Sequence, residues 1–381
     1  MPNQIKERMS NFELLRIIAM FMIVLHHSII YGVMTKSLWL NGSRLNQFFV
    51  WLYFPGGEIG VGLFFMITGY FLITSDKIKL SKVILQTYFY GVLSVIIYFV
   101  ACLFGKGEVL VSSYGFLDSE IKIRIISNVF APLRSSQFWF VSAYIVLLCF
   151  KPVYNKFLRK LNKKGYVIFL IILWSFGLVF STYTVIALGY TKAVFYYALG
   201  GYIKRYVPEI KCKKNVVLFL LLSIFLWFMY AVIRFFSMNF DCKNLLIKKC
   251  VLLSCSLIPS CCFVVAISIS ISIFIFFMNY EIQNNGIINS IGSTTFGIYL
   301  FHESFFCRFL IWDGIIKVYS KLFQTSLFWL YDFISVCCVF LVTSLFEFLR
   351  LKFLEPVVGN IYINICNRIN KSLIIEGANN E

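Results

Sequence analysis

Apolar segments long enough to cross a lipid bilayer recur along the whole chain, and they restrict its fold more than any other feature. An α-helix needs about 20 apolar residues to cross the hydrocarbon core. The composition agrees, since 60% of the 381 residues are hydrophobic, whereas soluble domains are nearer half apolar. Because backbone polar groups cannot remain unpaired in hydrocarbon, we predict an all-α polytopic membrane protein.

The hydropathy pattern predicts about ten transmembrane helices with both termini in the cytoplasm. Their approximate limits are residues 12–34, 57–75, 81–104, 137–152, 165–185, 190–205, 215–238, 250–279, 291–315 and 326–349. The first segment is too long for the core of a signal peptide and contains charged residues, so we expect it to be retained. Residues 1–355 are expected to form a single transmembrane domain, and residues 356–381 a cytoplasmic tail.

Lysine and arginine cluster in alternate short loops, which the positive-inside rule places in the cytoplasm. These residues are Lys6, Arg8, Lys77, Lys79, Lys82, Lys151, Lys156, Arg159, Lys160, Lys163, Lys164, Lys204, Arg205, Lys211, Lys213 and Lys214. We attribute the formal charge of +18 to topology and lipid contact, and expect no nucleic-acid partner. The twelve cysteines show neither metal-ligand spacing nor a disulfide framework, so no metal site is expected.

The first predicted helix carries Glu13, Arg16, His26 and His27 within an apolar segment. Such groups cost several kcal/mol in hydrocarbon unless they face protein or water. Helical geometry places Arg16 and His27 on one face, within about 20° of each other around the axis and about 16 Å apart along it. His26 points about 80° away from that face. We interpret the shared face as the wall of a reaction channel; the alternative is a snorkelling arginine and a structural histidine.

Polar and aromatic residues in other predicted helices are further candidates. Glu58 follows a glycine pair near the outer end of the second helix, where glycines also permit close helix packing. Trp139 and Tyr144 lie in the fourth helix. We interpret them as substrate contacts; the alternative is that they are interfacial anchors. His302, followed by Glu303, lies in the ninth helix at a depth similar to that of His27. The two histidines could line one cavity, although a structural role for His302 is equally consistent.

The last predicted helix carries Asp332 and Glu347 near its ends, and we expect both at the membrane interface. The sequence contains no P-loop, no His-Glu-x-x-His motif and no Gly-x-Ser-x-Gly motif. Any chemistry would therefore be general acid–base or nucleophilic catalysis by histidine.

Four segments resemble motifs of the type-three membrane acyltransferases. NFELLRIIAMFMIVLHH is similar to the first helix of that family, whose signature of an arginine, ten residues and a histidine is matched by Arg16 and His27. GGEIGVGLFFMITGYFLI, FWFVSAYIVLLCFKPVYN and GSTTFGIYLFHES resemble three later motifs, in the order of the family. The resemblance covers nearly the whole chain.

The resemblance implies transfer of an acyl group, usually acetyl, from cytoplasmic acetyl-CoA to a hydroxyl of a cell-surface carbohydrate. Acetyl-CoA would be a substrate and not a permanently bound cofactor. The acceptor would be a capsule or exopolysaccharide, possibly lipid-linked, at a bacterial plasma membrane. Some relatives carry an added extracytoplasmic hydrolase-like domain, and we expect this protein to be of the simpler form without one. It has Lys77, Lys79 and Lys82 where many relatives carry an arginine pair.

The same resemblance implies roles for the candidate residues. His27 would act as general base or accept the acyl group, with His302 in support. Arg16, oriented by Glu13, would bind a CoA phosphate or polarise the thioester. Glu58, Trp139 and Tyr144 would contact the glycan. The alternatives are a transporter or flippase of lipid-linked saccharides, against which the absence of an inverted repeat weighs, and a structural scaffold.

Overall fold

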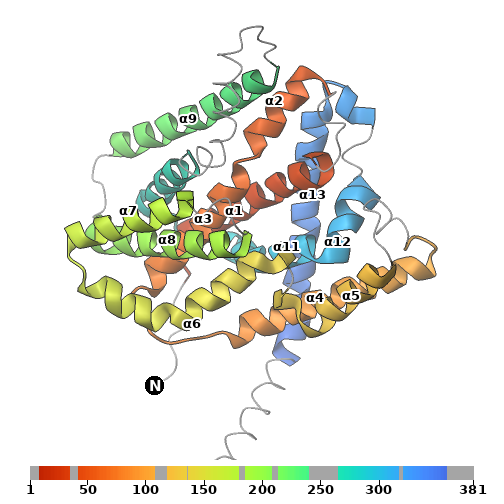
Figure 1. Cartoon of the computed structure of the whole chain (residues 1–381), viewed down its shortest axis with the longest axis horizontal. Helices are drawn as coiled ribbons and strands as arrows, with labels where there is room; N and C mark the ends of the chain where they lie inside the picture. The colour runs from red at the N-terminus through yellow and green to blue at the C-terminus, as the bar shows by residue number, and fades with distance from the viewer. Residues whose placement is uncertain are drawn as a thin grey trace, which may run out of the picture.

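The computed structural model describes residues 8–34, 42–107, 118–134, 136–179, 185–207, 213–239, 265–316 and 321–357. Within these residues the regular secondary structure is entirely helical, as the sequence predicts (Figure 1). The α-helices are α1 (Ser10–His27), α2 (Arg44–Tyr53), α3 (Gly56–Leu72), α4 (Ser81–Leu103), α5 (Asp118–Phe130), α6 (Trp139–Lys160), α7 (Lys163–Val179), α8 (Val185–Tyr206), α9 (Lys213–Asn239), a helix at Val265–Asn279, α11 (Gly286–Glu303), α12 (Phe305–Phe309) and α13 (Phe328–Leu349).

Six stretches of the described residues are long and apolar enough to cross a membrane. They are Ser10–Met34, Arg44–Leu72, Ser81–Leu103, Trp139–Lys160, Lys214–Ser237 and Phe328–Val357. Six of the predicted spans overlap with them, although some of the bounds differ by several residues. The predicted spans at 165–185, 190–205 and 291–315 correspond to α7, α8 and α11 with its continuation. Residues 250–264 and 358–381 lie outside the described residues, so the full count of spans, the cytoplasmic termini and the tail stay predictions.

Short π-helical segments extend three of the α-helices, at Ser28–Met34 (η1), Leu310–Ile316 (η8) and Arg350–Leu354 (η10). The first begins directly after His27, so α1 is uninterrupted from its acidic start to its two histidines. The ninth predicted span is not continuous, because Ser304 has an extended ψ of 138° between α11 and α12. The chain therefore changes direction immediately after Glu303.

Glycines allow α3 to lie very close to α1 and α8, the two helices that flank it. A Cβ atom at Gly60 would lie 2.4 Å from the carbonyl oxygen of Ala19 in α1, and one at Gly69 1.9 Å from that of Tyr197 in α8. These separations leave no room for a side chain. Small residues let helices in lipid approach until backbone and side chains interlock, so the expected glycine packing is confirmed.

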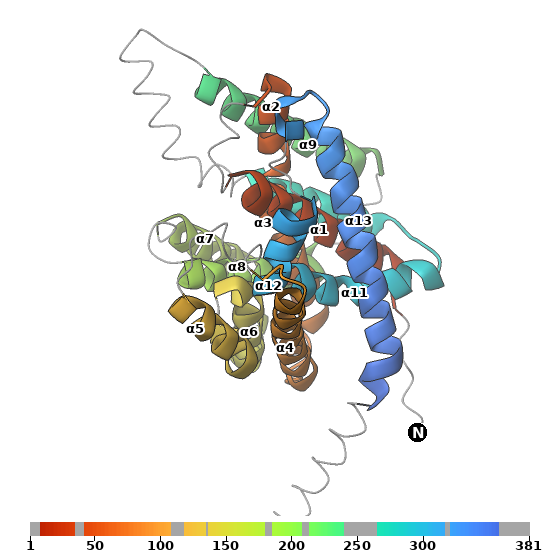
Figure 2. The same ribbon diagram turned by 90° about the vertical axis from the view of Figure 1, so that its right-hand side faces the viewer.

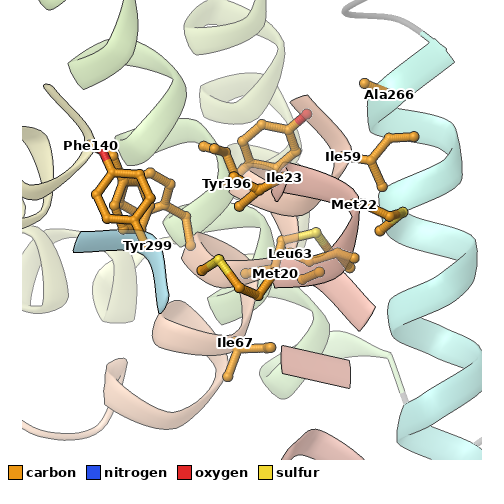
Figure 3. Packing of buried hydrophobic residues seen from close by; sticks show 14 of the residues in the cluster. Met20, Met22, Ile23, Ile59, Leu63, Ile67, Phe140, Tyr196, Ala266 and Tyr299 are labelled. Carbon is orange, nitrogen blue, oxygen red and sulfur yellow. The ribbon is translucent and has the colours of Figure 1, made fainter. Parts of the chain in front are cut away.

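The packed interior is formed by side chains from helices that are distant in sequence. In Figure 3, Met20 and Ile23 of α1 and Leu63 of α3 lie in the same cluster as Tyr196 of α8. Across the cluster, the rings of Phe140 in α6 and Tyr299 in α11 lie 5.2 Å apart. Figure 2 shows α13 running lengthwise beside α1 and α11. Helices α1 and α11 are thus enclosed on several sides by protein.

The loop after α3 is fastened to α6 by hydrogen bonds. The buried Asn155 side chain donates to the carbonyl oxygens of Leu72 and Ser75, at 2.8 and 3.0 Å. Asp76 forms an ion pair of 2.7 Å with Arg159, and the hydrogen bond from that guanidinium lowers the pKa of the Asp76 carboxyl. The hydrogen bonds from the buried Asn155 therefore hold the basic loop, which the sequence predicts to be cytoplasmic, against α6.

The two acidic residues of α13 correct a prediction. Asp332 and Glu347 were expected at the interface, but both are fully buried. Asp332 accepts a hydrogen bond of 3.1 Å from Ser28, the first residue of η1. Glu347 accepts hydrogen bonds from Tyr90 and from Arg350, both at 2.6 Å. Each carboxyl group faces other helices and not the lipid, because it has a polar partner there.

Candidate functional site

Helices α1 and α11, which are far apart in the sequence, meet at His27, the last residue of α1. Its Nδ1 lies 2.9 Å from Nε2 of His302 and 3.0 Å from Oε2 of Glu303, both in the last turn of α11. His302 and Glu303 are buried, and the His27 side chain is 12% exposed. The proximity of the two histidines, which the sequence left open, is therefore a finding of the structure.

Close packing of α1 on α11 brings these residues together. Gly292 stands opposite Glu13, where a Cβ atom would lie 2.5 Å from the carboxylate oxygen Oε2. Because a larger residue would separate the helices at that point, the glycine sets their spacing. From there α1 and α11 run to their carboxyl ends, and His27 and His302 meet.

Hydrogen bonds fix which nitrogen of each imidazole carries a proton. Nδ1 of His302 lies 2.6 Å from the carbonyl oxygen of Ile298, which can only accept, so this nitrogen donates. In neutral His302, Nε2 is then an acceptor, and the Nδ1–H of His27 donates to it. Neutral His27 is left with a lone pair on Nε2. Among the residues that the structure describes, none forms a hydrogen bond with that atom.

The carboxylate of Glu303 is held through one of its two oxygens. Oε1 accepts hydrogen bonds from the Tyr31 hydroxyl at 2.7 Å and from Nη1 of Arg308 at 3.2 Å. The Arg308 guanidinium also lies over the Tyr31 ring, 4.3 Å from its centroid. Oε2, the oxygen nearest His27, accepts no hydrogen bond within the described part of the chain. A buried negative charge therefore stands beside the imidazole of His27.

Arg16 and Glu13 form the ion pair that the sequence predicts at the other end of α1. Nη1 of Arg16 donates to Oε1 of Glu13 at 2.9 Å, and Nη1 of Arg8 lies 3.4 Å from Oε2 of the same carboxylate. The Glu13 side chain is buried, while that of Arg16 is 33% exposed. Because α1 is α-helical throughout, Arg16 and His27 share a face about 16 Å apart, as predicted.

His26 occupies a different environment from His27, which confirms the predicted difference between them. Its Nδ1 is hydrogen-bonded to the carbonyl oxygen of Phe54, at the break between α2 and α3. A Cβ atom at Gly57 would lie 2.3 Å from the His26 ring. His26 thus fastens α1 to the start of α3, and it has no contact with His302.

The three residues predicted to contact substrate each have a partner in the protein. Glu58 forms an ion pair of 2.6 Å with Lys192 of α8. Trp139 packs against Gly189, where a Cβ atom would lie 2.5 Å from its ring. Tyr144 stacks on Phe140, with ring centroids 6.3 Å apart. The structure places these residues where α3, α6 and α8 meet, and their contact with substrate stays a prediction.

Tyr299 links this group to the histidines. Its ring lies 5.2 Å from that of Phe140 and stands perpendicular to the His302 ring at 6.1 Å. Its hydroxyl donates to the carbonyl oxygen of Gln137 at 3.2 Å. The first turn of α6 therefore lies against the same side of α11 as His302.

Lys192, Arg308 and Tyr31 had no role predicted from the sequence. A lone lysine in the apolar sequence of α8 was the only signal for Lys192. Arg308 follows Glu303 by five residues, but the break at Ser304 brings the two side chains together. Tyr31 lies near the helix face that carries Arg16 and His27, and this position was the sequence signal for a place in the site.

His27, His302 and Glu303 are also arranged as metal ligands would be. One donor atom of each residue lies within 4.8 Å of the other two. No metal site was expected from the sequence, because its cysteines and histidines lack short ligand spacing, whereas His302 follows His27 by 275 residues.

The chain matches the model of a known protein family. Residues 9–348 match a family model described as an acyltransferase domain. The match includes all of α1 and α11 and ends within α13. Neither the curated proteins nor the solved structures contain a match to the chain.

Proposed function

Because this chain belongs to the membrane acyltransferase family 3, we propose that it transfers an acyl group from a cytoplasmic acyl-CoA to a polysaccharide hydroxyl. Membership of the family and the apolar helices support acyl transfer at a membrane. The acyl group that we propose is acetyl, and the acceptor a capsule or exopolysaccharide, free or lipid-linked, at a bacterial plasma membrane.

The observation that carries this proposal is the free lone pair on Nε2 of His27. A general base must be unprotonated and within reach of the proton that it removes. His302 holds the proton of His27 on Nδ1, so that Nε2 can accept the proton of a sugar hydroxyl. General base catalysis of this kind contributes about 10²–10⁴-fold in rate.

The proton and the acyl group move in one balanced sequence. The hydroxyl gives its proton to Nε2 of His27, and its oxygen attacks the thioester carbonyl carbon. The carbon–sulfur bond then breaks, and the CoA sulfur takes the proton from the His27 imidazolium. The ester and the free thiol are the products. The Glu303 carboxylate, 3.0 Å from Nδ1, stabilises the imidazolium while it exists.

Arg16 and the basic loop after α3 fit the CoA end of the donor. A guanidinium binds phosphate or polarises a carbonyl oxygen through charged hydrogen bonds, and Glu13 holds that of Arg16 in place. The arm of CoA is long enough to join a phosphate near Arg16 to a thioester near His27. Lys77 and Lys79 are exposed in the fastened loop, where they attract phosphate electrostatically.

Glu58, Trp139 and Tyr144 are proposed to meet the acceptor sugar. Trp139 and Tyr144 are both half-buried, and Trp139 packs against Gly189, three residues before the lysine of the Glu58–Lys192 ion pair. Aromatic faces suit the apolar faces of sugar rings, and a paired carboxylate is a fixed hydrogen-bond acceptor. A flippase of lipid-linked saccharides is the second candidate, because buried charged residues also occur in transport pathways.

A complemented deletion strain tests the proposed function. NMR of the surface polysaccharide from cells with the deletion is expected to show polymer without its acyl esters. The wild-type gene should restore the esters, and His27→Ala should not, at equal protein level in the membrane. His26→Ala is the matched control and should restore most of them. Loss of the polymer itself in the deletion strain would instead support the flippase.

A further inference from the structure

Three buried donor atoms converge where α1 and α11 end. Nδ1 of His27 lies 2.9 Å from Nε2 of His302 and 3.0 Å from Oε2 of Glu303, and one donor atom of each residue lies within 4.8 Å of the other two. In a tetrahedral zinc site with bonds of about 2.0–2.2 Å, ligand atoms are about 3.3–3.5 Å apart. The two separations from Nδ1 of His27 are therefore only a few tenths of an ångström shorter than those of a zinc site.

The outer hydrogen bonds of the cluster match those of metal ligands. A ligating histidine almost always donates its second ring N–H to a carbonyl or carboxylate, and His302 donates Nδ1–H to Ile298. This leaves Nε2, the nitrogen that faces the cluster, unprotonated. Ligating carboxylates are in turn hydrogen-bonded, and Tyr31 and Arg308 both bind Oε1 of Glu303.

The oxygen of Glu303 that faces the histidines is the atom that most clearly requires a ligand. Oε2 is buried and accepts no hydrogen bond in the described part of the chain. A buried carboxylate oxygen without a donor is unfavourable, and a divalent cation would satisfy it. Two imidazoles and one carboxylate are a ligand set that zinc takes, with a fourth position left for water.

From this convergence we propose that His27, His302 and Glu303 bind a divalent zinc ion, and that zinc bound there inhibits the acyltransferase. The inhibition rests on the proposed function. Zinc coordinates Nδ1 of His27 only after that nitrogen loses its proton, so the ring proton moves from Nδ1 to Nε2. The imidazole then has no free lone pair for a hydroxyl proton. The zinc-free form is the active one, because zinc and the acceptor hydroxyl require different tautomers of the His27 ring.

Zinc binding is tested on the full-length protein purified in detergent and stripped with a chelator. Titration with ZnCl₂, with bound metal counted by mass spectrometry after gel filtration, should show one ion per chain. The ligand-field absorption of bound Co²⁺ reports nitrogen and oxygen ligation independently. His302→Ala and Glu303→Gln should each weaken zinc binding at least about 100-fold, and Tyr31→Phe about 10-fold.

His26→Ala is the matched control, because His26 adjoins His27 but is bonded to Phe54, and it should bind zinc as the wild type does. Gel-filtration profiles establish which variants fold. If His302→Ala does not fold, zinc binding by Glu303→Gln, which keeps the shape of the side chain, tests the site instead. Absence of a stoichiometric ion, or equal binding by all variants, would overturn the site.

The inhibition is tested on the same preparation by release of free CoA in the presence of acceptor. The chelator-treated protein should turn over, and one equivalent of zinc should abolish turnover. Activity that requires zinc would overturn the inhibition while leaving the site. An active protein that binds no zinc would refute this inference and leave the proposed function standing. A protein that binds zinc but never turns over would refute the proposed function and the inhibition together.

Discussion

Nδ1 of His27 lies 2.9 Å from Nε2 of His302, although 275 residues separate them in the chain. The hydrogen bond from His302 to Ile298 gives this contact a direction, since it makes His302 the acceptor and His27 the donor. The contact therefore orients the proposed base as well as joining α1 to α11. We propose that His302 is a positioning residue whose function another acceptor could supply.

Replacement of His302 tests that role. His302→Ala removes the acceptor, so the His27 ring can rotate or change tautomer, and kcat should fall about 10–100-fold with little change in KM for acyl-CoA. His302→Gln places an amide oxygen where Nε2 stood and should restore much of the loss. CoA release across a range of acyl-CoA concentrations separates the two constants. Equal loss of kcat in both variants would show that the imidazole itself is needed.

The local part of the site could be predicted from the sequence, because it depends on helix geometry alone. The spacing of Arg16 and His27, the Glu13–Arg16 pair and the divergence of His26 all follow from about 100° of rotation per residue. The structure agrees because α1 is regular over its whole length.

The contacts between helices could not be predicted in this way. Hydropathy gives the depth of a residue in the bilayer but not the neighbour that it faces, because lipid and protein interiors are equally apolar. Asp332 and Glu347 were therefore assigned to the interface although both face other helices. The pairing of Glu303 with Arg308 depends on the break at Ser304, for which the sequence offered no proline or glycine signal.

The Glu303–Arg308 ion pair should show strong coupling in stability. Removing one member of a buried pair leaves the other charge uncompensated, at a cost of about 3–5 kcal/mol. Arg308→Met alone should therefore destabilise the protein by about that amount. Glu303→Gln combined with Arg308→Met should be less harmful than Arg308→Met alone, because no buried charge remains. Unfolding of the purified proteins in detergent measures both, and additive effects of the two substitutions would contradict a direct pair.

Glycine packing between α3 and α8 gives a second stability test. A Cβ at Gly69 would lie 1.9 Å from the backbone oxygen of Tyr197, and backbone atoms cannot rotate away. Gly69→Ala should destabilise the protein by about 1–3 kcal/mol, as overpacking does. Gly286→Ala is the control, because no atom lies within 4 Å of the added Cβ there. In thermal unfolding, the midpoint temperature should be lower for Gly69→Ala only. An unchanged midpoint for Gly69→Ala would show that α3 and α8 lie further apart.

Asn155 provides the last prediction, because it links α6 to both the loop after α3 and α8. Its amide nitrogen donates to Leu72 and Ser75, and its oxygen accepts from the Tyr197 hydroxyl at 2.7 Å. Asn155→Leu keeps the approximate volume but leaves these buried groups unpaired, at about 1–3 kcal/mol for an unsatisfied group.

The basic loop carrying Lys77 and Lys79 would then be held to α6 only by Lys151 and Arg159, so KM for acyl-CoA should rise several-fold while kcat changes little. Asp76→Asn is the matched control, since its ion pair with Arg159 is solvent-exposed, and such pairs contribute about 0–1 kcal/mol. Steady-state measurement of CoA release decides between the possibilities. An Asn155→Leu protein that is less stable but has an unchanged KM would show that the loop does not bind the donor.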